Sequence, residues 1–253
     1  MKKYFVMAMA MMMVATMAMA QGLSEDETES TWSASVSASA VSRYVGSSGT
    51  RLTDGPVAQT ESTISHESGL SLTFWTSKGL KSGDGISDEV DFILGYEKEI
   101  GGALFSFSAG YYDFVRATDG NVWCLSAGMS REYKFEGSSD SLTPALRFEK
   151  VIPAGSDCPY SSAFLVEVST EARLGLKDFD LYLTPALVFD EGEYGGLRHF
   201  MWRWELGAEF EVGGVTISPS ITWFRPSEIG VSEEDMLELE KNMVVGLKLT
   251  KEF

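Results

Sequence analysis

Histidine, the side chain that most often acts as a catalytic base, is scarce in this sequence of 253 residues, which contains only two. A hydrolase built on a Ser, His and acid set, or on an Asp and His pair, needs a histidine as its base. His66 lies in the segment HESG, where a role in turn geometry is expected, and no serine lies in phase near His199. The sequence therefore predicts no catalytic residues and no enzyme.

The two cysteines, Cys124 and Cys158, could form a covalent link. In an oxidising compartment a structural disulfide between them is the expected state, and two free thiols are the alternative. A metal site is not expected, because two cysteines without histidines in register make an incomplete ligand set. We predict neither a metal nor any other cofactor.

Charged residues alternate with large apolar ones, most clearly in residues 199–214, HFMWRWELGAEFEVGG. At 3.6 residues per turn a helix would spread the alternate positions around its circumference, whereas a strand sends successive side chains to opposite faces. The segment is therefore predicted to be a strand with one apolar face and one charged face.

The same alternation predicts twelve strands. Their connections alternate between tight turns and longer segments rich in Gly, Ser and Asp, except that REYKFEGSSD stands where a tight turn is expected. The predicted strands are 32–45, 56–65, 69–78, 88–98, 103–114, 122–131, 142–152, 162–174, 179–189, 198–212, 215–224 and 238–253.

An even number of strands with alternating short and long connections indicates an all-β fold, a transmembrane up-and-down antiparallel β-barrel of about 12 strands. A soluble β-sandwich is the alternative. Strands of about ten residues favour the barrel, as does a set of aromatic residues near the long connections that would form an interfacial girdle. The expected girdle is Phe74, Trp75, Tyr96, Tyr111, Tyr112, Trp123, Tyr182, Phe189, Trp202, Trp204, Trp223 and Phe224.

The N-terminal segment is typical of a secreted protein. Lys2 and Lys3 precede an apolar run that ends in Ala18-Met19-Ala20, so residues 1–20 are predicted to be a signal peptide. Residues 21–31 are polar and acidic and are predicted to be a disordered periplasmic segment before a barrel over 32–253. Removing the signal peptide leaves 18 basic against 37 acidic residues, because only Lys2 and Lys3 are lost. The resulting net charge of −19 argues against a nucleic-acid partner.

The C-terminal strand ends in Phe253, which resembles the terminal signature that the barrel insertion machinery recognises in bacterial outer-membrane proteins. The segments HESGLSLTFWTS (66–77), DEVDFILGYEKEIGG (88–102) and YYDF (111–114) are similar to the TorF-like porin family. This resemblance covers a third to a half of the mature chain and implies a porin-like barrel in the bacterial cell outer membrane. It supplies no catalytic residues.

The charged faces of the predicted strands would line a narrow lumen, since twelve strands lie between the eight that leave a filled interior and the sixteen that leave an open channel. Such charges could select permeating ions or could pair and hold the barrel's shape. The predicted lining is Arg43, Glu61, Asp91, Arg147, Glu149, Glu167, Glu171, Arg173, Arg203, Glu205, Glu209 and Lys248.

Three functions follow from this prediction. The preferred one is a porin-like channel for passive diffusion of small solutes, with a mild cation preference from the acidic excess. The second is a plugged structural or adhesive barrel that binds partners through acidic loops such as the one containing Asp190, Glu191 and Glu193. The third and weakest is a lipid-modifying enzyme. The expected partners are outer-membrane lipid, lipopolysaccharide and small solutes.

Overall fold

The computed structural model describes residues 31–47, 51–53, 55–81, 88–115, 120–155, 158, 162–191, 199–226 and 242–253. The expected signal peptide lies outside the described residues, as do all but the last residue of the expected periplasmic segment. The described residues contain no helix long and apolar enough to cross a membrane.

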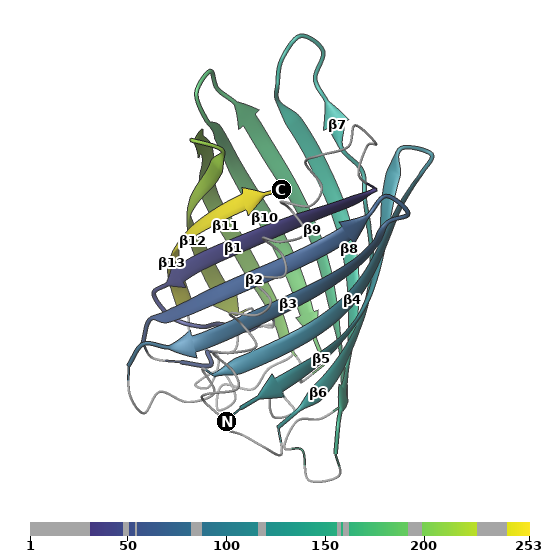
Figure 1. Cartoon of the computed structure of the whole chain (residues 1–253), viewed down its shortest axis with the longest axis vertical. Helices are drawn as coiled ribbons and strands as arrows, with labels where there is room; N and C mark the ends of the chain where they lie inside the picture. The colour runs from purple at the N-terminus through teal and green to yellow at the C-terminus, as the bar shows by residue number, and fades with distance from the viewer. Residues whose placement is uncertain are drawn as a thin grey trace.

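Thirteen strands form one antiparallel sheet in which strands pair with their neighbours along the chain, except that β6 pairs with β8 in place of β7 (Figure 1). Pairing of β1 with β13, and of β6 with β8, closes twelve of them into a ring. The strands are β1 (Trp32–Val41), β2 (Val57–His66), β3 (Leu70–Gly79), β4 (Glu89–Ile100), β5 (Ala103–Phe114), β6 (Val122–Ser130), β7 (Tyr133–Lys134), β8 (Ser141–Pro153), β9 (Ala163–Gly175), β10 (Asp180–Asp190), β11 (His199–Val212), β12 (Val215–Pro226) and β13 (Asn242–Glu252). The predicted fold class, a closed antiparallel barrel of twelve strands, is confirmed.

The extra strand β7 explains the long connection REYKFEGSSD. Tyr133 and Lys134 pair with Leu142 and Ser141 at the start of β8, so the segment is a hairpin that extends β8 beyond the ring. The turn at its tip includes Gly137, whose φ is 79°. The connection between β6 and β8 therefore still ends in a short turn, which lies at the tip of the β7 hairpin. The alternation of short and long connections is kept.

Two other short turns use pairs of glycines at positions that a side chain would strain. Gly101 and Gly102 have φ of 62° and 78°, and Gly213 and Gly214 have φ of 61° and 72°. Two consecutive residues with positive φ match the twist of adjoining antiparallel strands, which is why glycine pairs are favoured in two-residue hairpins. These turns fix the register of β4 with β5 and of β11 with β12.

The strand boundaries agree with the prediction within a few residues, with two differences. The predicted strand 32–45 ends at Val41, because the chain turns into the barrel after that residue. Residues 238–241 of the last predicted strand lie outside the described residues.

The outer surface of the barrel is apolar. Leu94, Phe107 and Val168 are 57%, 53% and 55% exposed although they lie within long strands. On β13 the outward positions are Met243, Val245, Leu247 and Leu249, all exposed. An apolar belt of this extent around a closed sheet is stable only when hydrocarbon covers it.

Aromatic side chains lie on this outer surface near the long connections, as an interfacial girdle requires. Trp202 and Trp204 stack with ring centroids 5.9 Å apart, and Tyr111 packs on Trp123 at 4.9 Å. Four members of the expected girdle are wrongly assigned, because the strand phase sends them inward. They are Trp75, Tyr112, Tyr182 and Phe224, which share a face with Asp91, Cys124, Arg173 and Arg203 of the paired strands.

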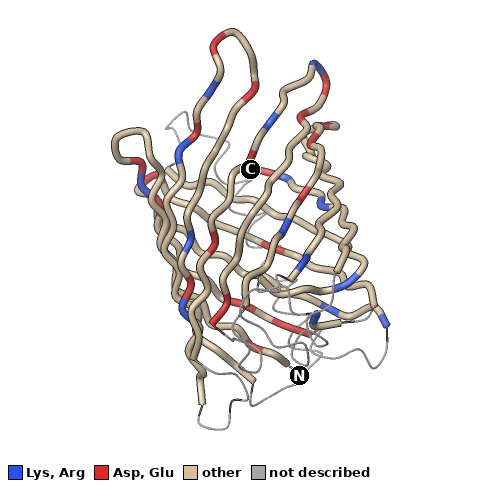
Figure 2. Tube along the Cα trace, turned by 180° about the vertical axis from the view of Figure 1, so that it is seen from behind, with Lys and Arg blue, Asp and Glu red and all other residues tan. Residues whose placement is uncertain are grey.

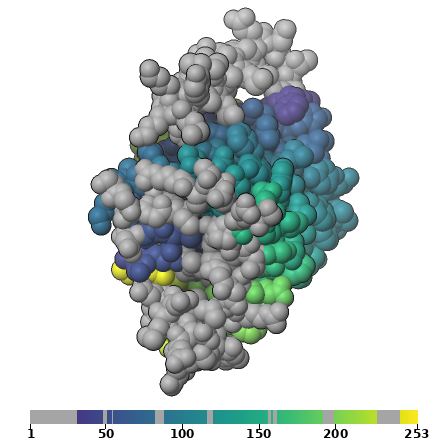
Figure 3. Space-filling model, turned by 90° about the horizontal axis from the view of Figure 1, so that it is seen from below, coloured from purple at the N-terminus to yellow at the C-terminus, as the bar shows by residue number. Residues whose placement is uncertain are grey.

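The buried core lies inside the ring, at the end that bears the long connections, which Figure 3 views from outside. One apolar cluster consists of Phe114, Val122, Cys124 and Val151, with Tyr112 and Cys158 packed against it. A second consists of Leu165, Val188, Met201 and Phe224, with Val45 and Val244 against it. The interior at this end therefore combines apolar clusters with buried polar residues such as Glu89, Asp190 and His199.

A charge placed on the outer surface should destabilise the barrel far more than the same charge placed inside. Val168→Arg, in the middle of β9, should lower the free energy of unfolding by about 2–4 kcal/mol, since it puts a cation in hydrocarbon. Ser169→Arg, on the inner face one residue later, is the matched control and should cost much less. Urea unfolding of both variants in lipid vesicles measures the difference, and equal losses would contradict the assignment of faces.

Candidate functional site

The interior of the barrel contains most of the charges that the sequence places on strands. Eleven of the twelve predicted lining residues lie on inward faces of strands, and Arg43 lies two residues beyond the end of β1. Arg43 donates from Nη1 to Oδ1 of Asn242, at the start of β13, over 3.2 Å. The geometry places all twelve side chains toward one space, and their role in lining a conducting pore stays a prediction.

Charges on β8, β9 and β11 form ion pairs on the inner face of the barrel. Arg147 pairs with Glu149 two residues along the same face of β8. Arg203 donates from Nη2 to Oε1 of Glu167 over 2.7 Å, joining β11 to β9 past the small side chain of Ala186 on β10. Because Glu149 and Glu167 are 4% and 7% exposed, these pairs replace the water that buried carboxylates would otherwise require.

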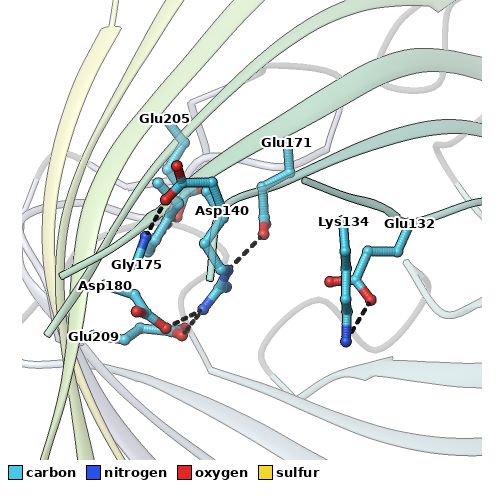
Figure 4. Close-up of polar contacts among 10 residues, drawn as sticks. Glu132, Lys134, Asp140, Glu171, Gly175, Asp180, Glu205 and Glu209 are labelled. Carbon is cyan, nitrogen blue, oxygen red and sulfur yellow. Dashed lines mark hydrogen bonds and ion pairs between the residues drawn. The ribbon is translucent and has the colours of Figure 1, made fainter. Parts of the chain in front are cut away.

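A second cluster surrounds Arg173 nearer the short turns (Figure 4). The guanidinium donates to Glu171 over 3.1 Å, to Asp180 over 3.4 Å and to Glu209 over 2.5 Å. Its side chain is 27% exposed. One cation thus holds three carboxylates from β9, β10 and β11, and the cluster keeps an excess of negative charge.

Two further contacts involve acids on the inner face. Lys248 of β13 lies 3.5 Å from Glu61 of β2 and spans β1 between them. Glu205 accepts a hydrogen bond from the hydroxyl of Tyr182 over 3.0 Å. The ring of Tyr182 covers Gly207, where a Cβ would lie 2.3 Å from the tyrosine ring, so glycine is required there.

The two halves of the wall differ in charge. In the view of Figure 2, charged segments recur along the strands of the second half of the chain. Among the described strands of the ring, every basic side chain on an inward face comes from β8–β13: Arg147, Arg173, Arg203 and Lys248. The inward faces of β1–β6 bear acids and many small hydroxyls instead, namely Ser33, Ser35, Ser37, Ser39, Thr63, Ser65, Ser71, Thr73, Ser77, Ser106, Ser108, Ser126 and Ser130.

The connection between β1 and β2 folds into the lumen at the long-connection end. The hydroxyl of Tyr44 donates to Oε2 of Glu89 over 2.5 Å, and the Tyr44 ring lies 5.9 Å from that of Trp75. Thr53 accepts a hydrogen bond from the Tyr44 backbone over 2.9 Å and is 4% exposed. Val45 packs on the second apolar cluster, so this connection crosses the interior and narrows it.

The expected disulfide is absent: no bond joins Cys124 to Cys158. Both belong to one apolar cluster, as their predicted proximity requires. Cys124 points inward among Phe114, Val122 and Val151, whereas the Cys158 thiol donates to the carbonyl oxygen of Asn121 over 3.5 Å. Both thiols therefore border the same cluster, and no disulfide joins them there.

The two histidines have different surroundings. His66 Nδ1 contacts the Ser68 hydroxyl at 2.9 Å and accepts from the Ser68 backbone at 3.2 Å, which confirms its role in turn geometry. His199 is buried on the inner face, opposite Asp190. Within the described ranges, no group of three or more His, Cys, Asp or Glu residues is arranged to hold a metal ion.

The acidic segment proposed as a partner-binding loop is only partly visible. Asp190 is the last residue of β10 and is 2% exposed, so it cannot serve as a surface contact. Glu193 lies outside the described residues, as do Glu228, Glu233, Glu234 and Asp235 of the other acidic connection.

Several residues of the site were missed from the sequence. Glu89 shares the inner face with Asp91, two residues away, so the alternation itself could have identified it. Asp180 and Tyr182 follow the same phase as Arg173 across the hairpin. Tyr44 had no such signal, because it belongs to a connection whose inward course depends on tertiary packing.

Comparison with known proteins shows the fold alone. No family model matches the chain, and no curated protein matches it. The structure is similar to the NanC porin, with a TM-score of 0.50 and 10% identity over 85% of this chain and 97% of that chain. An outer membrane channel from Pseudomonas putida F1 has a TM-score of 0.51 and 7% identity over 91% and 98%. A bacterial polysaccharide outer membrane secretin has a TM-score of 0.50 and 9% identity over 88% and 98%.

The chain is an outer-membrane β-barrel. The apolar belt, the aromatic girdle and the closed ring agree with this conclusion, and they place the protein in the bacterial outer membrane. Its architecture is that of porin and channel barrels, and its own transport properties are considered below.

Removing the central cation of the Arg173 cluster should destabilise the barrel. Arg173→Ala leaves Glu171, Asp180 and Glu209 facing one another, and should lower the free energy of unfolding by about 1–3 kcal/mol. Lys134→Ala is the matched control, since the pair of Lys134 with Glu132 is exposed in the β7 hairpin and should contribute at most about 0.5 kcal/mol. Urea unfolding in lipid vesicles measures both.

The loss should shrink when Glu209→Gln is added to Arg173→Ala, because one of the three repelling charges is then removed. An unchanged stability of Arg173→Ala, or no recovery in the double variant, would show that the cluster does not hold β9, β10 and β11 together.

Proposed function

We propose that the protein is a narrow porin-like channel for passive diffusion of small solutes across the outer membrane. The observation that carries the proposal is the polar, net acidic interior, which lies between a hydroxyl-rich wall on β1–β6 and an ion-paired wall on β8–β13. A barrel that had only to hold its shape could fill this space with apolar side chains. A water-filled passage instead requires polar groups that stay hydrated.

The charges inside favour cations. Arg147 and Arg203 are matched by Glu149 and Glu167, so those pairs add little net field. Glu205 is held by the neutral hydroxyl of Tyr182. Around Arg173, three carboxylates face one guanidinium. The remaining negative potential raises the local concentration of cations and repels anions.

The resemblance of HESGLSLTFWTS and DEVDFILGYEKEIGG to the TorF-like porin family supports the same proposal. On the same basis we propose that the strand ending in Phe253 is recognised by the barrel insertion machinery and that lipopolysaccharide contacts the outer rim. No enzymatic role is proposed.

A second function is favoured by one specific observation. The two apolar clusters inside the long-connection end, together with Val45, could seal the passage. The protein would then be a structural or adhesive barrel. The two functions differ in what the intact protein does in a planar bilayer: steady unit currents indicate a channel, and silence indicates a sealed barrel.

The channel should be cation-selective, and Glu205 should contribute to that selectivity. In a salt gradient the reversal potential of the wild type should have the sign that indicates preferential permeation of cations. Glu205→Gln should move it toward zero, because the variant removes a negative charge that forms no ion pair within the described part of the chain. Glu132→Gln, on the exposed hairpin, is the matched control and should leave it unchanged. An anion-selective wild type would refute the proposal.

Removing the connection that crosses the lumen should increase the current. Replacing residues 42–56 by Asn-Gly joins Val41 directly to Val57, which already face each other across β1 and β2. For a channel, the unit conductance should rise from a measurable wild-type value. For a sealed barrel, currents should appear only in the variant. A variant that folds but conducts like the wild type would show that the connection is not the constriction.

A further inference from the structure

A cavity of about 380 Å³ lies on the inner side of the wall, where β3–β6 meet β8 and β9. Six serine hydroxyls belong to its lining residues, along with one guanidinium and two carboxylates. The polar residues are Ser71, Glu97, Ser106, Ser108, Ser126, Ser130, Arg147, Glu167 and Ser169. Its volume is within the range of sites that bind small molecules.

Glycines in the wall create the room for these hydroxyls. A Cβ on Gly95 would lie 2.4 Å from the Oγ of Ser71, and a Cβ on Gly128 would lie 2.6 Å from the Oγ of Ser106. Both distances are far below van der Waals contact. The hydroxyl of a serine on the neighbouring strand therefore lies over each glycine, in space that a side chain would fill. The wall stays thin beside the cavity.

Glu167 lines the cavity and carries an unused acceptor. The side chain is 7% exposed, and its Oε1 accepts from Arg203 over 2.7 Å. Among the described residues its Oε2 has no hydrogen-bond partner. A buried carboxylate oxygen without a donor carries a free-energy penalty. A ligand hydroxyl placed in the cavity would remove that penalty.

Of the three charged side chains in the lining, Arg147 and Glu167 are neutralised by neighbours, and Glu97 is exposed. Glu149 pairs with Arg147, and Arg203 pairs with Glu167. An ionic ligand would have to compete with these pairs, whereas hydroxyl groups can donate to Glu167 and both donate to and accept from the serines. The chemistry of the lining is thus complementary to a neutral molecule rich in hydroxyl groups.

We propose that this cavity is a binding site for a small neutral polyhydroxylated solute of monosaccharide size. The inference rests on the proposed channel function, for which the site would be a stopping point along the passage. Occupancy brings the solute against the hydroxyl wall of β5 and β6 on one side and Glu167 of β9 on the other.

The test is saturation-transfer NMR on the full barrel in detergent micelles, with glucose as the neutral probe and gluconate and protonated glucosamine as charged probes of the same size. Glucose should bind, and both charged probes should bind more weakly. Glu167→Gln keeps the shape of the side chain and should weaken glucose binding about tenfold, as expected for losing a charged acceptor. Ser126→Val with Ser130→Val should weaken it by a similar factor, and Ser35→Val, on β1 away from the cavity, is the matched control.

Tighter binding of glucosamine than of glucose would overturn the proposal, because Glu167 would then be a cation site. Absence of glucose binding, or equal binding by wild type and both cavity variants, would also overturn it. The measurement is separate from conductance: a protein that conducts without binding glucose refutes the cavity alone, whereas one that binds glucose without conducting supports the cavity and refutes the channel.

Discussion

Every peptide group of this sheet that lies in hydrocarbon must find its hydrogen-bond partner within the protein, and this constraint determines the rest of the structure. It requires the last strand to pair with the first, as β13 does with β1, and β6 to reach past the β7 hairpin to β8. Once the ring is closed, the alternation of side chains assigns each residue to lipid or to the interior. The apolar belt, the ion pairs and the cavity are consequences of that single division.

The charged side chains of the interior must then be neutralised within a limited space. Acids outnumber cations on the inward faces, and the few guanidinium groups are shared, most clearly at Arg173, which contacts three carboxylates. At the other end the chain adds apolar packing and an inward connection to its buried polar groups. The interior is consequently charged near the short turns and narrowed by packing near the long ones, an arrangement that fits the proposed narrow, selective channel.

Much of the fold could be predicted from the sequence because a period of two is a local signal. From His199 to Val212 the alternation of apolar and charged residues shows which side chains face lipid and which face the interior. Applying the same test along the chain predicts the ring of twelve strands. The prediction was wrong where aromatic character was given more weight than the alternation of faces along the strand. Trp75 and Tyr182 were assigned to the girdle because they are aromatic, although they lie on the same inward face as Asp91 and Arg173. Three features depend on contacts between distant segments, which no local pattern encodes. They are the inward path of Tyr44 and Val45, the surroundings of the two cysteines, and the unpartnered Oε2 of Glu167 among the described residues.

The uneven distribution of cations bears on how the cylinder is built. Among the described residues, the inward strand faces of β1–β6 carry carboxylates and no basic side chain, so these carboxylates repel one another, with Arg43 in the connection after β1 as a counter-charge at one end. Lys248 supplies a positive group to Glu61 only when the final strand docks against the first. Glu61 is therefore neutralised only when β13 pairs with β1 and closes the ring. The step that removes the exposed strand edges also relieves the repulsion at Glu61.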